Sequence, residues 1–380
     1  MKEKKVPSIF ILVDSLNVGG IERLSLDESY WLKAANINSS VLVLGIHKQS
    51  TTIMDVDDVY FTENKINIVY LGKNKLTQLR SLVKLFKKTS KKSIVVSHSA
   101  GGIGLIFLSK ILTFKKIRAF LWIHQAITLS KRAQANKRIF YSLFAEKIFF
   151  GARHFQIEWT RYISRSIWKV FYYKKSHFDR IGVFLPRVNW EKHEKVHFCD
   201  NHPQVSHIIF ASRMTSWKGF EKFQDICDSL LNREIHSIVM RVNSGEISNK
   251  SNKVDEFEHT AVNLSPSNIH TNNRLVHFYP TNYGNKVRYP QSIGLNVLEF
   301  LALGIPSLIS QESFLTFPEL KNSPLIQVVD WDSLSDVKVA FEKAKSLNVQ
   351  ERMKEAKHLF SAISIEKHMN TIVEEFGRDI

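Results

Sequence analysis

One carboxylate, Glu299, stands in a segment of this chain that is otherwise too apolar for the protein surface. Residues 288–310 predict a polar loop, a short helix, a Gly-x-Pro stop and a buried strand at Ser307–Ser310. Glu299 lies between Leu298 and Phe300 in that helix, and a buried carboxylate needs hydrogen-bond donors. A ribose cis-diol supplies two donors, while the N–H groups and positive dipole end of the helix N-terminus suit a phosphate. One short helix is therefore predicted to hold both ends of a nucleoside diphosphate.

Both ends of this helix are marked in the sequence. We predict Ser292 as the N-cap, Gly304 as the residue just past the C-terminus and Pro306 as the residue that prevents continuation. The helix is expected to pack through an apolar stripe of four residues: Leu295, Leu298, Leu301 and Ala302.

Two cations, Arg213 and Lys218, follow another predicted strand, His207–Ala211. Ligands of open α/β sheets bind outside the carboxyl ends of the strands. Arginine offers a planar fork of N–H groups and lysine a point charge, so the pair suits a diphosphate. Ordinary surface cations give the same pattern, and the presence of Glu299 in the same half of the chain favours a binding site.

Two histidines follow predicted strands in the first half of the chain. His98 comes after Ser93–Ser97. His124 comes after Arg118–Ile123. Both are expected at strand ends that face the cleft. A purely structural histidine is the alternative at either position.

Glycines and acidic residues add weaker signals. The pair Gly19-Gly20 follows the first predicted strand and opens a helix, which allows close approach of the backbone to an anion or a sugar. A tight strand-to-helix turn also needs glycine. The Asp-x-Asp sequence at Asp55-Val56-Asp57 is predicted to be a solvated acidic turn and not a metal site.

The segment around Glu299 resembles the nucleotide-sugar site of GT-B glycosyltransferases of the retaining GT4 type. The family pattern is roughly E-G-F-G-L-x-x-x-E-A-x-A-x-G-x-P-V. The matching residues here are Gln291-Ser292-Ile293-Gly294-Leu295, then Glu299, then Gly304-Ile305-Pro306. The resemblance extends along nearly the whole chain, with strong motifs at 208–219 and 288–310.

Two further segments resemble motifs of the same family. Ile208–Lys218, followed by Gly219, resembles the G-R-x-x-x-x-K-G segment, with Ser212 in the place of the first glycine. Asp14–Arg23 resembles the L-x-x-G-G-x-E-R segment.

The resemblance implies an α/β fold of the GT-B type, with two Rossmann-like parallel-sheet domains facing a central cleft. It implies sugar-donor binding by Gly19, Gly20, Arg213, Lys218, Gln291, Ser292, Ile293, Gly294, Leu295 and Glu299. It also implies catalytic roles for His124, Gln291, Arg213 and Lys218, with His98 as an additional cleft residue. No metal and no cofactor are expected, because basic residues and a helix end replace the cation in this family.

Gln291 departs from the family pattern, which has a glutamate that contacts hydroxyl groups of the transferred sugar. Glutamine keeps the length and one carbonyl acceptor but loses the charge. We interpret this as a change in sugar-donor preference, and an inactive or merely nucleotide-binding protein is the alternative. Because no carboxylate nucleophile stands here, the expected route is front-face attack, with the departing phosphate helping to deprotonate the acceptor hydroxyl.

Strands alternate with helices in both halves, which predicts parallel α/β sheets. The predicted strands are Ser8–Val13, Ser40–Leu44, Ile66–Leu71, Ser93–Ser97, Arg118–Ile123, His207–Ala211, Ser237–Arg241, Val276–Tyr279, Ser307–Ser310 and Ile326–Val329. Helices are predicted in the first half at Ile21–Ala35, Leu76–Thr89 and Gly102–Thr113. The predicted parts are an acceptor-side domain at 1–186, a linker at 187–204, a nucleotide-sugar domain at 205–364 and a C-terminal helix at 365–380. The resemblance implies that this helix returns to the first domain.

The net charge of +17 is concentrated in the first half of the 380 residues. Residues 1–190 hold 32 Lys and Arg against 12 Asp and Glu, whereas residues 191–380 hold 21 against 24. Such a field attracts an anionic partner, and a merely solubilising surface is the alternative. Two cysteines predict neither a disulfide framework nor a metal site, and no apolar run is long enough to cross a membrane.

Two segments of the basic half combine apolar side chains with cations. Leu76–Lys92 places four apolar residues on one helical face, namely Leu79, Leu82, Val83 and Phe86. That face either enters an acidic membrane interface or packs on the domain core. Arg138–Lys175 interleaves aromatic residues with cations. We therefore expect a cytoplasmic protein held peripherally at the inner face of the cell membrane, and no nucleic acid as partner, because no nucleic-acid motif accompanies the charge.

Residues and resemblance together predict a retaining, metal-independent glycosyltransferase. It is expected to move a sugar from a nucleoside diphosphate to a lipid-linked glycan in bacterial surface polysaccharide synthesis, either lipopolysaccharide or capsule. A Rossmann dehydrogenase is disfavoured, because the chain lacks a G-x-G-x-x-G turn followed by an acidic residue. Sugar phosphorylases and epimerases stay open, as do an inactive nucleotide- or glycan-binding protein and a basic nucleic-acid-binding protein.

Overall fold

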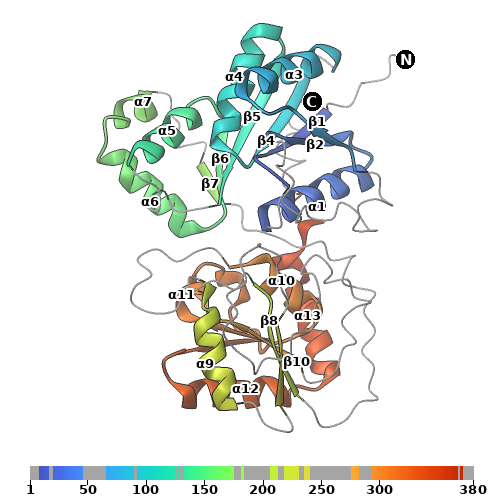
Figure 1. Cartoon of the computed structure of the whole chain (residues 1–380), viewed down its shortest axis with the longest axis vertical. Coiled ribbons are helices and arrows are strands. Elements are labelled where there is room, and N and C mark those ends of the chain that lie inside the picture. Colours follow the sequence, from blue (N-terminus) through green and yellow to red (C-terminus); the bar gives the residue numbers. More distant parts are fainter. Residues whose placement is uncertain are drawn as a thin grey trace. The chain divides into compact units, whose positions relative to one another are not determined.

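The chain forms two units, each a parallel sheet covered by helices (Figure 1). One unit comprises Met1–Pro186 and His368–Ile380, and the other comprises Arg187–Lys367. The computed structural model describes residues 8–16, 20–45, 66–89, 92–124, 127, 132–174, 181–183, 206–212, 218–230, 235–239, 275–281, 293–366 and 369–370. The linker predicted at 187–204 lies outside these residues.

The described strands of the first unit form a seven-stranded sheet in the order β3-β2-β1-β4-β5-β6-β7, with every pair parallel. Their bounds are Ser8–Val13 (β1), Ser39–Val43 (β2), Ile68–Tyr70 (β3), Lys92–Ser97 (β4), Lys116–Ile123 (β5), Lys147–Phe150 (β6) and Ile181–Val183 (β7). All six residues of β1 are buried, as expected for a central parallel strand. Leu12 of β1 pairs with Leu42 on one side and Ser97 on the other, so the strand order reverses between β1 and β4.

Helices connect these strands and cover the sheet (Figure 1). They are Gly20–Ala34 (α1), Lys75–Lys88 (α3), Ala100–Thr113 (α4), Arg132–Ser142 (α5), Arg153–Ser164 (α6) and Lys169–Lys174 (α7). The start of α3 is fixed by a capping box between Asn74 and Thr77. Leu82 and Phe86 of α3 are fully buried, so the apolar face of this helix belongs to the core and not to a membrane interface.

The described strands of the second unit form a five-stranded parallel sheet in the order β12-β11-β10-β8-β9. Its strands are Ser206–Phe210 (β8), Ile235–Val239 (β9), Leu275–Tyr279 (β10), Ser307–Ser310 (β11) and Ile326–Val329 (β12). Its helices are Phe220–Leu230 (α9), Leu295–Ala302 (α10), Gln311–Leu315 (α11), Leu334–Ser346 (α12) and Val349–Ile363 (α13), with a 3-10 turn at Pro318–Leu320. Aromatic rings fill its core: Phe223 lies 5.0 Å from Phe210, and Phe278 lies 5.6 Å from Trp331.

The predicted helix start at Ser292 is wrong. The N-cap of α10 is Gly294, whose extended backbone (φ −72°, ψ 148°) makes the helix begin at Leu295. At the other end Gly304 has a φ of +70°, the left-handed conformation expected of the glycine that follows a helix.

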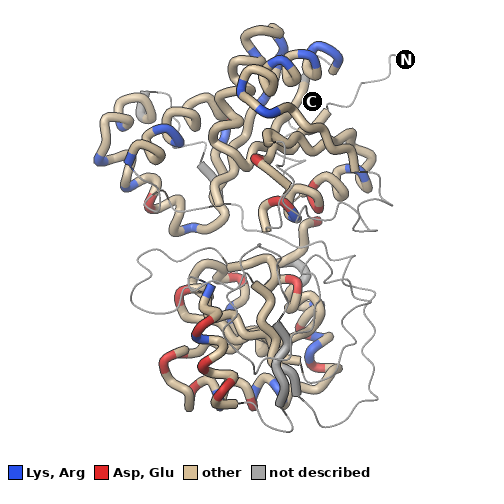
Figure 2. Tube along the Cα trace, viewed as in Figure 1, with Lys and Arg blue, Asp and Glu red and all other residues tan. Residues whose placement is uncertain are grey.

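Charge is distributed differently in the two units. Figure 2 shows Lys and Arg on the helices of the first unit, whereas Asp and Glu line α9 of the second. Within the described residues, no helix is both long and apolar enough to cross a membrane.

Candidate functional site

The carboxyl ends of β8 and β10 meet where the strand order of the second sheet reverses. A crevice at such a switch point is where open α/β sheets bind ligands. The segments that leave the two strands are joined there, because the hydroxyl of Thr281 donates to the backbone oxygen of Lys218 over 3.3 Å. Lys218, one of the predicted phosphate-binding cations, is thereby held at the switch point.

Gly219 allows this close approach. Its φ is +77°, and a Cβ at this position would lie 2.6 Å from the backbone oxygen of Pro280. Only glycine meets both conditions without strain. The backbone next to Lys218 is therefore pressed directly against the chain that leaves β10.

The first turn of α10 is tied to the end of β8. The side-chain amide of Asn296 donates to the backbone oxygen of Ala211 over 2.5 Å. The first N–H groups of a helix have no acceptor within the helix, and they lie at its positive dipole end. The N-terminus of α10 thus offers its N–H groups at the sheet edge that also holds Lys218.

Gly294 lets the chain enter α10 in this position. A Cβ on Gly294 would lie 2.2 Å from Oδ1 of Asn296 and 3.0 Å from the hydroxyl of Tyr279. The preceding N–H, of Ile293, donates to the hydroxyl of Thr316 over 3.0 Å. The entry to the helix is therefore held by packing on one side and by a hydrogen bond on the other.

Glu299 is buried, with 4% of its surface exposed. Its neighbours Leu298 and Phe300 are completely buried, as the apolar sequence predicts. Glu299 lies one helical turn after Leu295, so the two residues share a face of α10. A carboxylate is thus placed one turn away from the helix end that can accept a phosphate.

The remaining predicted residues of this site fall outside the described parts of the chain. These are Arg213, Gln291 and Ser292, together with Gly19 and the Asp55–Asp57 turn of the first unit. Gly20 is described, and it begins α1.

A pocket of about 390 Å³ lies in the first unit at the switch point between β1 and β4. It is lined by Asp14, Ile21, His98, Ser99, Ala100, Gly101, Leu121, Trp122, Ile123, His124, Gln134, Lys137, Arg138 and Tyr141. Both predicted histidines are among them. The structure therefore brings His98 and His124 together in one pocket.

The two histidines belong to a hydrogen-bonded chain that begins at Glu28 of α1. Oε2 of Glu28 lies 3.1 Å from Nε2 of His98, and Nδ1 of His98 lies 2.7 Å from Nε2 of His124. The side chains of Glu28 and His98 are 2% and 1% exposed. Burial lowers the pKa of His98 to about 3, so its contact with Glu28 is a hydrogen bond to a neutral ring and not an ion pair. Burial, and then the proximity of His98, lower the pKa of His124 well below its ordinary value.

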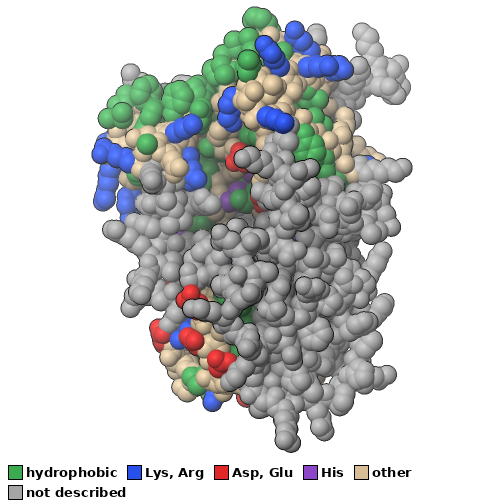
Figure 3. Space-filling view, in the orientation of Figure 1, with side chains coloured by type: hydrophobic (Ala, Val, Ile, Leu, Met, Phe, Trp, Pro, Cys, Tyr) green, Lys and Arg blue, Asp and Glu red, His purple; other side chains and the backbone are tan. Residues whose placement is uncertain are grey.

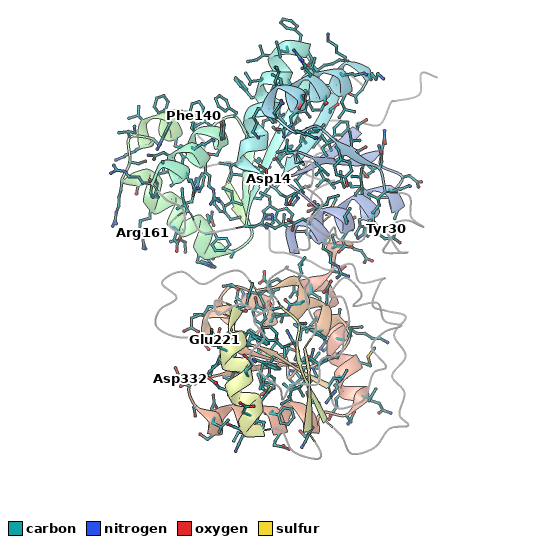
Figure 4. The ribbon with its side chains drawn as sticks, viewed as in Figure 1. Asp14, Tyr30, Phe140, Arg161, Glu221 and Asp332 are labelled. Atoms are coloured by element: carbon teal, nitrogen blue, oxygen red, sulfur yellow. The ribbon has the colours of Figure 1, made fainter. Side chains whose placement is uncertain are left out.

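Asp14 places a carboxylate in the same pocket. It follows β1 and lies beside the strands of the first unit (Figure 4). The hydroxyl of Ser99, the N-cap of α4, donates to Oδ1 of Asp14 over 2.7 Å. Burial lowers the pKa of Arg138, and the nearby Asp14 partly offsets this shift. The pocket thus combines hydrogen-bond acceptors with a half-buried cation, which suits a polar ligand rich in hydroxyl groups.

Sequence reasoning missed Glu28 and Arg138 as site residues. Glu28 looks like an ordinary charge in the middle of a helix, and it reaches His98 only because α1 packs against β1 and β2. No sequence signal marked it: Asp27, Glu28 and Ser29 are consecutive polar residues, and only the structure shows that this stretch of α1 is buried.

Searches of protein-family models and of curated proteins return no match for this sequence. Solved structures do resemble it along the whole chain. Anabaena HepE in complex with UDP-glucose has a TM-score of 0.69 at 9% identity, covering 98% of this chain and 99% of that one. The lipopolysaccharide outer core galactosyltransferase WaaB has a TM-score of 0.58 at 12% identity, covering 98% and 100%.

A third similar structure is an alpha-glucosyltransferase in complex with UDP and a 13-mer DNA. Its TM-score is 0.62 at 14% identity, covering 97% of this chain and 99% of that one. At such low identity the likeness concerns the fold. Two parallel α/β units, each with a switch point at its own sheet edge, make this chain a protein of the GT-B glycosyltransferase fold.

Proposed function

We propose that the protein is a glycosyltransferase that takes its sugar from a nucleoside diphosphate bound at the switch point of the second sheet. The observation that carries this proposal is the convergence of Lys218 and the N-terminus of α10 at one sheet edge, with the buried Glu299 one turn along the same helix. The lysine and the helix end suit a diphosphate, and the carboxylate suits the two hydroxyl groups of a ribose.

The proposed reaction is metal-independent and retains the anomeric configuration. The bond between the anomeric carbon and the diphosphate oxygen breaks, and the acceptor hydroxyl forms the new bond on the same face. Its proton passes to the departing phosphate. Lys218 and the N–H groups at the start of α10 stabilise the negative charge that develops on this leaving group. Gln291 is proposed to contact the transferred sugar as a neutral group.

The proposed acceptor is a glycan, lipid-linked and belonging to a bacterial surface polysaccharide. Support comes from a similar structure that is named a lipopolysaccharide outer core galactosyltransferase. The pocket of the first unit, with Asp14 and Arg138 in its lining, is the proposed place for the acceptor. A glycan offers both hydroxyl groups for the carboxylate and, where phosphorylated, an anion for the cation.

The first test is a thermal-shift screen of the purified full chain against UDP, GDP, ADP, CMP and their common sugar conjugates. A ligand at about 100 times its dissociation constant adds about 2.7 kcal/mol to the free energy of unfolding. We expect a rise in Tm with one nucleoside diphosphate. If no nucleotide raises the Tm of the folded protein, the alternative of an inactive or glycan-binding protein is supported. The glutamine at 291, in place of the family's glutamate, would agree with that result.

Matched variants locate the binding. Glu299→Gln and Lys218→Gln are expected to weaken nucleotide binding by about tenfold or more, because each removes a charge-assisted hydrogen bond. Glu312→Gln makes the same change at an exposed residue of the same unit and Lys222→Gln at a half-buried lysine paired with Asp332, and both are expected to leave binding unchanged. Equal effects of both pairs would place the nucleotide elsewhere.

We also propose that the first unit binds an anionic membrane through an apolar face on α4, α5 and α7. Its exposed members are Leu108, Ile111, Leu112, Phe114, Phe140, Ile167, Val170 and Phe171. Figure 3 shows hydrophobic side chains gathered on this part of the molecule, with Lys and Arg beside them. Exposed cations on the same helices are Lys110, Lys137 and Lys169. Phe140 marks the α5 part of this surface in Figure 4, whereas Arg161 of α6 lies on the other side of these helices.

Contacts between aromatic rings connect the parts of the apolar face. Phe107 of α4 lies 4.2 Å from Phe144, and Phe144 lies 5.2 Å from Phe140 of α5. Phe140 lies 6.1 Å from Trp168, which in turn lies 5.9 Å from Phe171 of α7. The surface is therefore one continuous patch. Apolar side chains flanked by cations suit the interface of an acidic bilayer.

A further inference from the structure

His124 is the last of three residues joined by buried hydrogen bonds, after Glu28 and His98. These hydrogen bonds determine which ring nitrogen of His124 carries the proton. Each link is short: 3.1 Å from Glu28 to His98 and 2.7 Å from His98 to His124. The planes of the two imidazole rings are inclined by only 17°, with their centroids 5.0 Å apart, so the hydrogen bond between them lies close to both ring planes. Trp122 packs against both rings, at 5.2 and 5.0 Å. The rings are thus held in place on several sides.

Proton counting along this chain leaves two arrangements. Both imidazoles are neutral at pH 7, because burial lowers their pKa values, so each ring has one N–H and one lone pair. If the carboxylate of Glu28 is ionised, it can only accept, so Nε2 of His98 carries the proton. Nδ1 of His98 is then an acceptor, and Nε2 of His124 must donate to it. If Oε2 of Glu28 carried a proton, every bond in the chain would run in the opposite direction.

The ionised arrangement is the one expected of this carboxyl group. An unperturbed glutamate is charged at neutral pH; burial of Glu28 opposes that charge, whereas an N–H of His98 donated to Oε2 favours it. With Nε2 of His124 committed to His98, Nδ1 is the ring atom left to meet a ligand. A Cβ on Gly151 would lie 3.4 Å from this nitrogen, so the glycine leaves the approach to Nδ1 without a side chain.

We propose that Glu28 is a positioning residue, acting through His98, that holds His124 in the Nε2–H form, so that His124 accepts a hydrogen bond from a sugar hydroxyl and does not bind a phosphate. The identification of that ligand as a sugar rests on the proposed glycosyltransferase function. A lone pair on Nδ1 attracts an O–H and repels the oxygens of a phosphate, which carry no proton at neutral pH. The Nε2–H form of His124 therefore favours a sugar hydroxyl over a phosphate as its ligand.

The proton positions can be read directly from the free protein. The full chain is labelled with 15N-histidine, and long-range 15N–1H correlation spectra are recorded between pH 8 and pH 5.5. Loss of signals in His98→Gln and His124→Gln assigns the two rings. Both are expected to be in the Nε2–H form throughout this range. A proton on Nδ1 of His124, or titration of either ring within the range, would overturn the inference.

A matched pair of variants tests the role of the carboxylate. Glu28→Gln keeps the shape but adds an N–H donor, so the reverse direction of the chain becomes available and both rings are expected to lose their single tautomer. Glu22→Gln makes the same change in the first turn of α1 and is expected to leave both spectra unchanged. Unaltered tautomers in Glu28→Gln would refute the positioning role. If Glu28→Gln does not fold, the tautomers seen in the wild-type spectra test the inference by themselves.

The sugar contact has its own measurement. With the nucleotide sugar found in the thermal-shift screen at saturation, Glu28→Gln is expected to lower kcat/KM for the glycan acceptor about tenfold, as for one lost hydrogen bond, with no change in the Kd of the nucleoside diphosphate. A matching loss of diphosphate affinity would mean that His124 contacts the phosphate, against the inference. A protein with the expected tautomers that binds no nucleotide would refute the proposed function alone.

Discussion

Three buried histidines make the folded protein sensitive to acid. Burial lowers the pKa of His98 and of His277 to about 3, and it lowers that of His124 well below the ordinary 6.5. In the unfolded chain these rings take up protons as the pH falls through about 6.5, while the folded protein leaves them neutral. Protonation therefore favours the unfolded chain, and stability present above pH 6.5 is lost as the pH falls towards the folded pKa values.

We predict a loss on the order of 1 kcal/mol per pH unit for each of these histidines below pH 6.5. Urea unfolding at several pH values, followed by tryptophan fluorescence, measures it. His277→Gln is expected to reduce the slope, whereas His358→Gln, at a ring that is 72% exposed, is expected to keep it. A stability that is constant down to pH 5 would contradict the buried, neutral state of the rings.

Phe114 is a residue that the fold alone does not explain. It caps α4 in the left-handed conformation, with a φ of 52°, and it is 94% exposed. A bulky side chain in this conformation is strained, whereas glycine is not. Nor does the ring gain stability from burial.

We predict that Phe114→Gly raises the free energy of unfolding by about 1 kcal/mol and at the same time weakens binding to acidic vesicles. Chemical denaturation measures the first effect and sedimentation with vesicles the second. Leu315→Gly, at a residue 66% exposed on α11 of the second unit, is a control for loss of an exposed apolar side chain and is expected to leave vesicle binding intact. A higher free energy of unfolding with unchanged vesicle binding would show that Phe114 is not part of the membrane-binding surface.

Among the secondary-structure elements, α10 depends most on one small residue. A side chain on Gly294 has no room beside Asn296 and Tyr279, so it must displace the first turn of the helix. We predict that Gly294→Ala lowers the free energy of unfolding by about 1–3 kcal/mol and weakens nucleotide binding. Thermal unfolding with and without nucleotide measures both effects.

Gly101→Ala provides the contrast for this prediction. Gly101 lies in α4, and a Cβ there would come no closer than 3.8 Å to its nearest neighbour, Oγ of Ser99. Alanine is therefore expected to stabilise the helix by about 0.5–1 kcal/mol. A loss of stability in both variants would mean that the space around Gly294 is not the cause.

The sequence predicted buried strands better than it predicted helix starts and long-range contacts. Ser8–Val13, Ser307–Ser310 and Ile326–Val329 are found with the predicted bounds, because a parallel strand covered on both faces is a continuous apolar run. The start of α10 was misplaced by the serine at 292, since capping preference is local and the packing around Gly294 is not. The elements α5 to β7 were not predicted, because aromatic and basic residues alternate there without a clear period.

The candidate site was predictable only in part for a related reason. Motif spacing identifies Lys218, Glu299 and His124 one at a time, each at the end of a strand or in a short helix. Glu28 lies 70 positions before His98, and only the packing of α1 against the sheet brings the two together. No local pattern contains that information.

At the scale of the whole molecule, the basic first unit is expected to respond to salt and to lipid charge. Electrostatic attraction to an acidic bilayer is screened within a Debye length of about 8 Å at physiological ionic strength. We predict that the full chain sediments with vesicles containing phosphatidylglycerol at low salt, that about 0.5 M salt weakens this binding, and that neutral phosphatidylcholine vesicles do not reproduce it. The assay is quantitative sedimentation.

Two outcomes would contradict the proposed membrane binding. Protein that stays in the supernatant at low salt would refute the proposed surface. Competition by a DNA duplex for the vesicles, followed by tight salt-sensitive DNA binding, would favour a nucleic-acid partner, as in the similar structure that contains DNA.

The strained, exposed ring at the end of α4 also has a consequence for the history of the sequence. If only folding were under selection, drift would replace Phe114 by glycine or asparagine, since the left-handed conformation favours both. If related sequences keep phenylalanine at this position, selection for membrane binding would explain it. In related proteins that do not bind a membrane, glycine or asparagine is expected at this position.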